Sequence, residues 1–158
     1  RPKRPGEVDE LDYIFLTPGR FDQLLGQGEF LEHAEVYGRH YGVPKGPLRK
    51  AMAAGKDAVV KVDVQGAATI RALAPEAFLI FLAAPSLEEL ERRLTTRKTE
   101  SPKQLRLRIA TAHEEVGRVD EFDCVIVNET DALQTTVERI VDVIRAQRAD
   151  VSRKPTLL

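Results

Sequence analysis

The sequence is poor in cysteine and in net charge. A single cysteine, Cys124, excludes an internal disulfide and indicates a reducing compartment such as the cytoplasm. The formal net charge of −1 does not fit a general nucleic-acid binder, which carries a basic excess. Every apolar run falls short of membrane-spanning length, and the sequence shows no secretory h-region. We therefore expect a cytoplasmic protein that binds neither nucleic acid nor a membrane.

Groupings of residues for covalent or metal catalysis are also missing. The three histidines, His33, His40 and His113, are scattered, and Cys124 stands in an apolar segment where packing is its expected role. No serine lies in a nucleophile-elbow motif. No glycine-rich loop is followed by Lys-Ser or Lys-Thr, the pattern that cradles nucleotide phosphates. Covalent catalysis and a metal held by protein ligands are therefore not expected.

The sequence does contain patterns that predict alternating strands and helices. With 42% hydrophobic and 31% charged residues it has the composition of one folded domain. The first part predicts strand 12–16, a helix from Pro18 ended by glycines, a hairpin of strands 29–36 and 40–43, and helix 48–54. The second part predicts strands 58–64, 78–83 and 124–127, separated by helices 67–73, 86–97 and one from Pro102, with a last helix near 133–144. This order is typical of an α/β protein with a parallel sheet, whose apolar strands are buried on both faces.

Arginines gather on two of the predicted helices. Arg93 and Arg97 are four residues apart and share a helix face, and Arg108 lies on the next helix. A polar loop, residues 98–101, joins the two helices. Arginines around a polar loop suit a lid over phosphates, because phosphoryl transfer depends on positioning and positive charge. For any one arginine a solvated surface position remains the more common alternative.

Two carboxylates suggest recognition of a base. Glu32 lies on a predicted strand and Asp63 ends another. Ionised carboxylates only accept hydrogen bonds, so they select the N1–H and 2-amino donors of guanine. The alternatives are an exposed strand residue for Glu32 and a helix N-cap for Asp63.

The segments RPKRPGEVDELDYIF, EFLEHAEVYGRHYG, VDVQGAATI, APSLEELERRL, TRKTE and VIVN together resemble the guanylate kinase family, in its order and at its spacings. The resemblance implies an enzyme that uses ATP and Mg²⁺ to convert GMP into GDP. It implies a P-loop NTPase-type doubly wound parallel sheet with a small α+β GMP-binding insert and a helical lid. The corresponding regions are 1–55 for GMP binding, 56–97 and 120–150 for the core, 98–102 for the lid loop with arms at about 86–119, and 151–158 for a flexible tail.

The same resemblance implies roles for individual residues. GMP would be bound by Arg1, Arg4, Glu7, Tyr13, Glu32, Tyr41, Gly42 and Asp63, with the base read by Glu32 and Asp63. The transferred phosphate would be stabilised by Arg93, Arg97 and Arg108, and Asn128 would lie near the adenine of ATP.

The sequence departs from the family pattern in several places. The strand, phosphate loop and helix with which guanylate kinases begin are missing, so we expect a fragment that folds poorly and is inactive alone. Val43 replaces a residue that contacts guanine, Lys61 replaces an acidic residue, and Lys98 replaces a lid glycine. The alternative function is a guanylate-kinase-like module without catalysis that binds phosphorylated peptides. A nucleic-acid contact through the basic tail is a weaker alternative, since acidic residues interrupt it.

Overall fold

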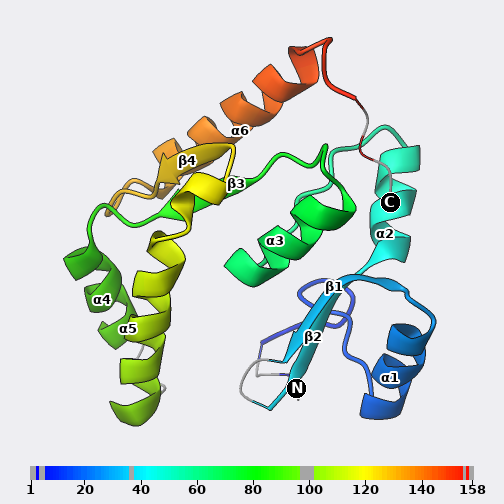
Figure 1. Ribbon diagram of the computed structural model, residues 1–158, viewed down its shortest axis with the longest axis horizontal. Helices are drawn as coiled ribbons and strands as arrows, with labels where there is room; N and C mark the ends of the chain where they lie inside the picture. The colour runs from blue at the N-terminus through cyan, green and yellow to red at the C-terminus, as the bar shows by residue number, and fades with distance from the viewer. Residues whose placement is uncertain (1–2, 4–5, 36–37, 97–101, 155, 157–158) are drawn as a thin grey trace. The chain divides into compact units, whose positions relative to one another are not determined.

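The computed structural model describes residues 3, 6–35, 38–96, 102–154 and 156, which form two compact units (Figure 1). The first unit comprises the chain up to Pro75, and the second comprises Glu76–Thr156. In the described part of the chain, no helix is long and apolar enough to cross a membrane.

The first unit is built on a β-hairpin. Strand β1 (Phe30–Glu35) pairs antiparallel with β2 (His40–Pro44), which confirms the predicted hairpin. It is preceded by α1 (Pro18–Gly26), whose N-terminus is capped by Thr17, with Oγ1 accepting from the Arg20 amide at 3.3 Å. It is followed directly by α2 (Lys45–Ala53), after which Gly55 takes a φ of 69° and turns the chain.

A bulge between Phe30 and Glu32 shifts the register, so that these two residues lie on opposite faces of the hairpin. Phe30 stacks on Phe21 of α1, with ring centroids 4.6 Å apart. Its ring also occupies the space beside Gly42, since a Cβ built there would lie 2.7 Å from Phe30 Cδ1. Beyond the bulge, Glu32 is in register with Val43 and Ala34 with Tyr41. Because paired residues share a face, Glu32, Val43 and Tyr41 lie opposite the Gly42 face.

Helix α3 (Val64–Leu73) completes the first unit and packs against β1. The predicted strand 58–64 is wrong, since the helix already begins at Val64 and residues 58–63 form no ladder in the described part of the chain. Within the apolar run that suggested a buried strand, Val59 is 78% exposed, whereas Val64 is buried at the start of the helix.

The predicted strand 12–16 is also wrong, and a side-chain-stabilised turn takes its place. The Asp9 carboxylate accepts from the Phe15 amide at 2.9 Å, and the Asp12 carboxylate accepts from the Val8 amide at 2.7 Å. These short polar side chains give the backbone an alternative to a ladder.

The second unit contains a parallel strand pair. Strands β3 (Ile80–Ala83) and β4 (Cys124–Val127) run in register from Ile80–Cys124 to Ala83–Val127. The crossover between them carries α4 (Leu87–Thr96), α5 (Pro102–Val116) and a short 3₁₀ turn, Val119–Glu121. The long α6 (Leu133–Ala149) lies along β4 (Figure 1). This crossover confirms the predicted parallel α/β organisation.

Burial of these strands on both faces was expected and is not observed. Leu82 and Val125 are 52% and 48% exposed. Each strand has one ladder partner among the described residues, so its other edge and part of its surface are uncovered.

Beyond α6, Arg153 of the predicted flexible tail contacts the unit. Arg153 donates to Gln147 Oε1 at 2.9 Å and to the Glu76 carbonyl, and its guanidinium lies 5.4 Å from the centroid of the Phe78 ring. Val151, by contrast, is fully exposed.

Candidate functional site

The first unit brings the two predicted base-reading carboxylates together. Glu32 is only 9% exposed, although it is an acidic residue on a short strand. Asp63 stands at the N-terminus of α3, the helix that packs on the same strand. Their charges interact, because Asp63 contributes to raising the pKa of Glu32. Two residues 31 positions apart in the sequence therefore form one acidic site.

Gly66 contacts both carboxylates. Its amide donates to Asp63 Oδ1 at 2.8 Å, which makes Asp63 the N-cap of α3. A Cβ built on Gly66 would lie 3.1 Å from Glu32 Cδ, so the Glu32 side chain occupies the space that any other residue would fill. The N-cap alternative for Asp63 is thus confirmed, and it is compatible with base recognition because Oδ1 alone accepts this bond.

Burial raises the pKa of Glu32, and the nearby Asp63 charge raises it further, while His33 partly opposes the shift. Desolvation penalises the charged form of a carboxyl group, so the ionised side chain gains more from a hydrogen-bond donor here than in water. A partly desolvated acceptor of this kind favours ligands that can donate to it.

The other described residues that were predicted to bind GMP lie on the hairpin and in the segment before α1. Tyr41 shares the hairpin face of Glu32, whereas Gly42 lies on the opposite face against Phe30. Tyr13 is 48% exposed and its ring contacts Phe15, with centroids 5.9 Å apart. Glu7 is half-buried in the segment before the Asp9 turn. Arg1 and Arg4 lie outside the described residues.

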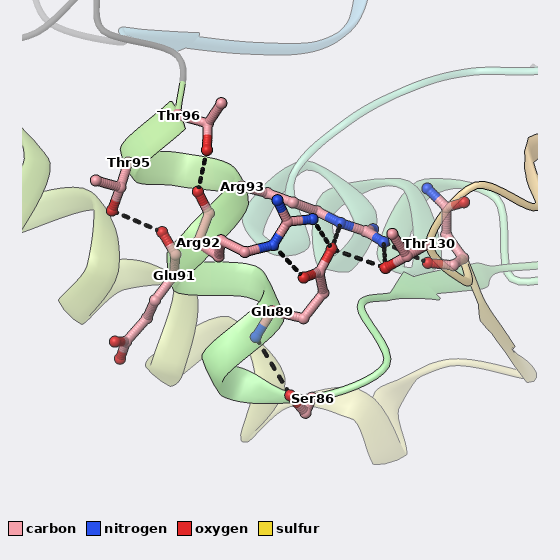
Figure 2. A network of polar contacts seen from close by, with 9 residues as sticks. Ser86, Glu89, Glu91, Arg92, Arg93, Thr95, Thr96 and Thr130 are labelled. Atoms are coloured by element: carbon pink, nitrogen blue, oxygen red, sulfur yellow. Dashed lines mark hydrogen bonds and ion pairs between the residues drawn. The ribbon is translucent and has the colours of Figure 1, made fainter.

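The second unit contains a polar network around Arg93 (Figure 2). Its Nε donates to Glu89 Oε1 at 2.6 Å. Its Nη2 donates to the Asn128 carbonyl at 3.0 Å and to Thr130 Oγ1 at 3.2 Å. Arg93 therefore connects α4 to the segment that follows β4, where the carboxyl end of a parallel strand commonly meets ligands.

Glu89 is the acceptor at the centre of this network. Besides Arg93 it accepts two bonds from Arg92, at 2.6 and 2.8 Å, and one from Thr130 Oγ1 at 2.9 Å. Its side chain is 15% exposed. The bonds from Arg92, then Arg93, lower the pKa of Glu89 to about 2, so it is ionised throughout the physiological range.

Asn128 accepts hydrogen bonds through both its backbone carbonyl and its side chain. Its carbonyl accepts from Arg93, and its Oδ1 accepts from Thr136 Oγ1 at 3.2 Å, where Thr136 is 3% exposed. Arg108 is half-buried on α5, and Arg97 lies outside the described residues. The lid loop predicted at 98–102 falls almost entirely outside them as well.

Sequence reasoning missed Gly66, Glu89 and Thr130. The Glu89 amide donates to Ser86 Oγ at 3.2 Å, which is one half of a capping box at the start of α4. The spacing of four between Glu89 and Arg93 was the available signal for their ion pair. Thr130 and Gly66 gave no comparable signal, since their contacts depend on the fold.

Comparison with protein families matches residues 1–147 to "Guanylate kinase". The chain belongs to the guanylate kinase family. It is 46% identical over 155 residues to "Guanylate kinase 2, chloroplastic/mitochondrial" of Oryza sativa, covering 98% of the chain and 54% of that protein. It is 44% identical to "Guanylate kinase" of Thermobifida fusca, covering 92% of the chain and 71% of the relative.

A solved structure supports the same assignment at the level of the fold. The crystal structure of guanylate kinase from Anaplasma phagocytophilum matches 97% of the chain and 74% of its own length, with a TM-score of 0.79 and 33% identity. The chain thus spans about half of the rice relative and about three quarters of the bacterial proteins.

Proposed function

We propose that this chain carries the GMP-binding and lid parts of an enzyme that transfers the γ-phosphate of ATP to GMP, giving ADP and GDP. The observation that supports it most is the Glu32–Asp63 pair at the N-terminus of α3. A buried carboxylate whose pKa is raised by desolvation is costly to keep unless a ligand or partner uses it. A guanine base carries two adjacent hydrogen-bond donors, N1–H and the 2-amino group, and the two carboxylates can accept hydrogen bonds from them.

In the proposed reaction the base is recognised by Glu32 and Asp63, through the N1–H and 2-amino groups. Tyr41, on the Glu32 face of the hairpin, would contact the GMP phosphate together with Tyr13, Arg1 and Arg4. Glu7 and Gly42 would lie at the edge of the pocket. Val43 is in register with Glu32 and can neither donate nor accept, so selection falls on the two carboxylates.

The chemical step is the attack of a GMP phosphate oxygen on the γ-phosphorus of ATP. A bond forms between them as the bond from the γ-phosphorus to the ADP oxygen breaks. Negative charge spreads over the transferred group, and arginines stabilise it electrostatically. Arg93, Arg97 and Arg108 are the proposed stabilising residues, and Asn128 is proposed to lie beside the adenine.

Mg²⁺ is proposed to enter with ATP. In the part of the chain that the structure describes, no group of three or more His, Cys, Asp or Glu residues could hold a metal ion. Mg²⁺ usually keeps several waters and binds substrate phosphates with few protein ligands, which is the reason for proposing that it enters with ATP. A doubly wound parallel sheet and a cytoplasmic location complete the proposal.

The test is a coupled assay of ADP formation in the intact natural protein, with ATP and each of GMP, AMP, CMP and UMP. We expect GMP to be used with the highest kcat/KM. Turnover of AMP as fast as GMP would contradict the roles of Glu32 and Asp63. Absence of ADP formation together with tight binding of a phosphorylated peptide would support the alternative module.

The matched variants are Glu32→Gln and Glu29→Gln. Glu29 immediately precedes the same strand, but its side chain is 45% exposed and lies 4.0 Å from the Arg49 guanidinium. We expect Glu32→Gln to lower kcat/KM for GMP by about 10- to 100-fold, the value of about 1.5–3 kcal/mol for a hydrogen bond to a charged group. Glu29→Gln should leave it unchanged.

A further inference from the structure

The bonds of Glu89, Arg93 and Thr130 form a closed ring. Arg93 donates to both other side chains, and Thr130 donates back to Glu89 at 2.9 Å (Figure 2). Each side chain of the ring is therefore fixed by two others. Such a ring costs less entropy than three separate bonds, because each added contact orders side chains that are already held.

The ring is also connected to Asn128, which lies outside it. Arg93 Nη2 reaches past it to the Asn128 carbonyl at 3.0 Å, and Thr136 holds the Asn128 side chain from the other side. A backbone carbonyl at the end of a parallel strand is thereby tied to a helix of the lid arm. Arg93 donates to three protein acceptors in this structure, so Glu89 and Thr130, which bond its guanidinium, help to set where it meets the Asn128 carbonyl.

We propose that Glu89 and Thr130 are positioning residues for the ATP side of the site, acting through Arg93 on Asn128. The inference rests on the proposed function for the identity of the nucleotide. It predicts that losing either side chain impairs use of ATP more than use of GMP, because the Glu32–Asp63 pair lies in the other unit and makes none of these bonds.

The experiment measures kcat and both KM values in the intact natural protein carrying Glu89→Gln or Thr130→Val. Glu89→Gln keeps the side-chain shape and removes the charge, and Thr130→Val removes the hydroxyl. The matched controls are Glu88→Gln, an exposed neighbour on α4, and Thr95→Val, whose hydroxyl bonds the Glu91 carbonyl of its own helix. We expect the KM for ATP to rise about 10-fold or more, with the KM for GMP changed less than about 2-fold, and the controls unchanged.

A double-mutant cycle with Arg93→Ala separates positioning from general destabilisation. If Glu89 acts through Arg93, Glu89→Gln should have no further effect once Arg93→Ala is present. Additive losses, or equal rises in both KM values, would overturn the inference.

If the unmodified protein forms no ADP when it is supplied with ATP and GMP, the proposed function is contradicted independently of this inference. The inference is then tested by calorimetric titration of ATP into the same variants. Unchanged affinity for ATP in Glu89→Gln and Thr130→Val would overturn it, and weakened affinity would support it.

Discussion

Replacing Gly66 by alanine tests whether the Glu32–Asp63 site requires a residue without a side chain at position 66. Gly66 is in the first turn of α3, where its amide caps onto Asp63. A Cβ at this position would lie 2.9 Å from Val62 Cβ, 3.1 Å from Glu32 Cδ and 3.3 Å from Glu32 Cγ. Val62 Cβ is fixed to the backbone, so the added methyl group has to displace the Glu32 side chain or the start of the helix.

The magnitude follows from two opposing terms. Inserting a methyl group into a filled site costs about 1–3 kcal/mol. Alanine favours a helix over glycine by up to about 1 kcal/mol. The net loss of unfolding free energy should be about 0–2 kcal/mol. Gly19→Ala is the matched control, since Gly19 is also in the first turn of a helix and nothing lies within 4 Å of its added Cβ. It should gain up to about 1 kcal/mol.

Urea denaturation of both variants gives the difference, which we expect to be about 1–3 kcal/mol in favour of Gly19→Ala. The same preparations are assayed for GMP, where Gly66→Ala should raise the KM because Glu32 is displaced. Glu32→Asp in the Gly66→Ala background shortens the crowded side chain and should restore part of the stability. Equal stabilities for the two alanine variants, with an unchanged KM for GMP, would refute the close approach of Gly66 to Glu32.

Three further predictions concern charge and the chain end. Because the pKa of Glu32 is raised in the fold, its contribution to stability is present below pH 4.5 and is lost as pH rises through the folded pKa. Glu32→Gln should therefore be more stable than the unmodified protein in urea at pH 7. The pKa of Glu89 is lowered to about 2, so its contribution is present above pH 4.5 and is lost as pH falls toward 2. Glu89→Gln should flatten the acid limb of a melting-temperature profile. Arg153→Ala removes the contacts with Gln147, Glu76 and Phe78, and should lower the unfolding free energy by about 1 kcal/mol in urea titrations.

Local patterns predicted the elements whose determinants lie close together in the sequence. Helix α1 has its capping Thr17, Pro18 and a terminal glycine in one short stretch of sequence, and the two strands of the hairpin are close neighbours in the sequence. The parallel pair β3–β4 followed from the order of elements. The prediction of strand 58–64 was wrong because an apolar run does not specify a partner strand. Asp63 instead caps a helix that begins at Val64.

The candidate site was predicted as residue types and only partly as contacts. Glu32 and Asp63 were paired by the chemistry of guanine, and the structure brings them together on packed elements. Arg93 was expected to face phosphates, whereas here it bonds Glu89, Thr130 and a backbone carbonyl. Its partners Asn128 and Thr130 are 35 and 37 residues away. No local pattern encodes such a contact, which exists only once the crossover has placed α4 beside the end of β4.

The two acidic groups differ in a way that supports separate roles. Glu89 has arginine partners at 2.6 Å and a lowered pKa, so its charge is already compensated within the protein. Glu32 is buried, lies near another carboxylate and has a raised pKa, so its charge is poorly compensated. A compensated charge gains little from a ligand, whereas an uncompensated acceptor gains a full charge-assisted hydrogen bond. On these grounds Glu32 is suited to bind a donor on a substrate, and Glu89 is suited to hold an arginine in place.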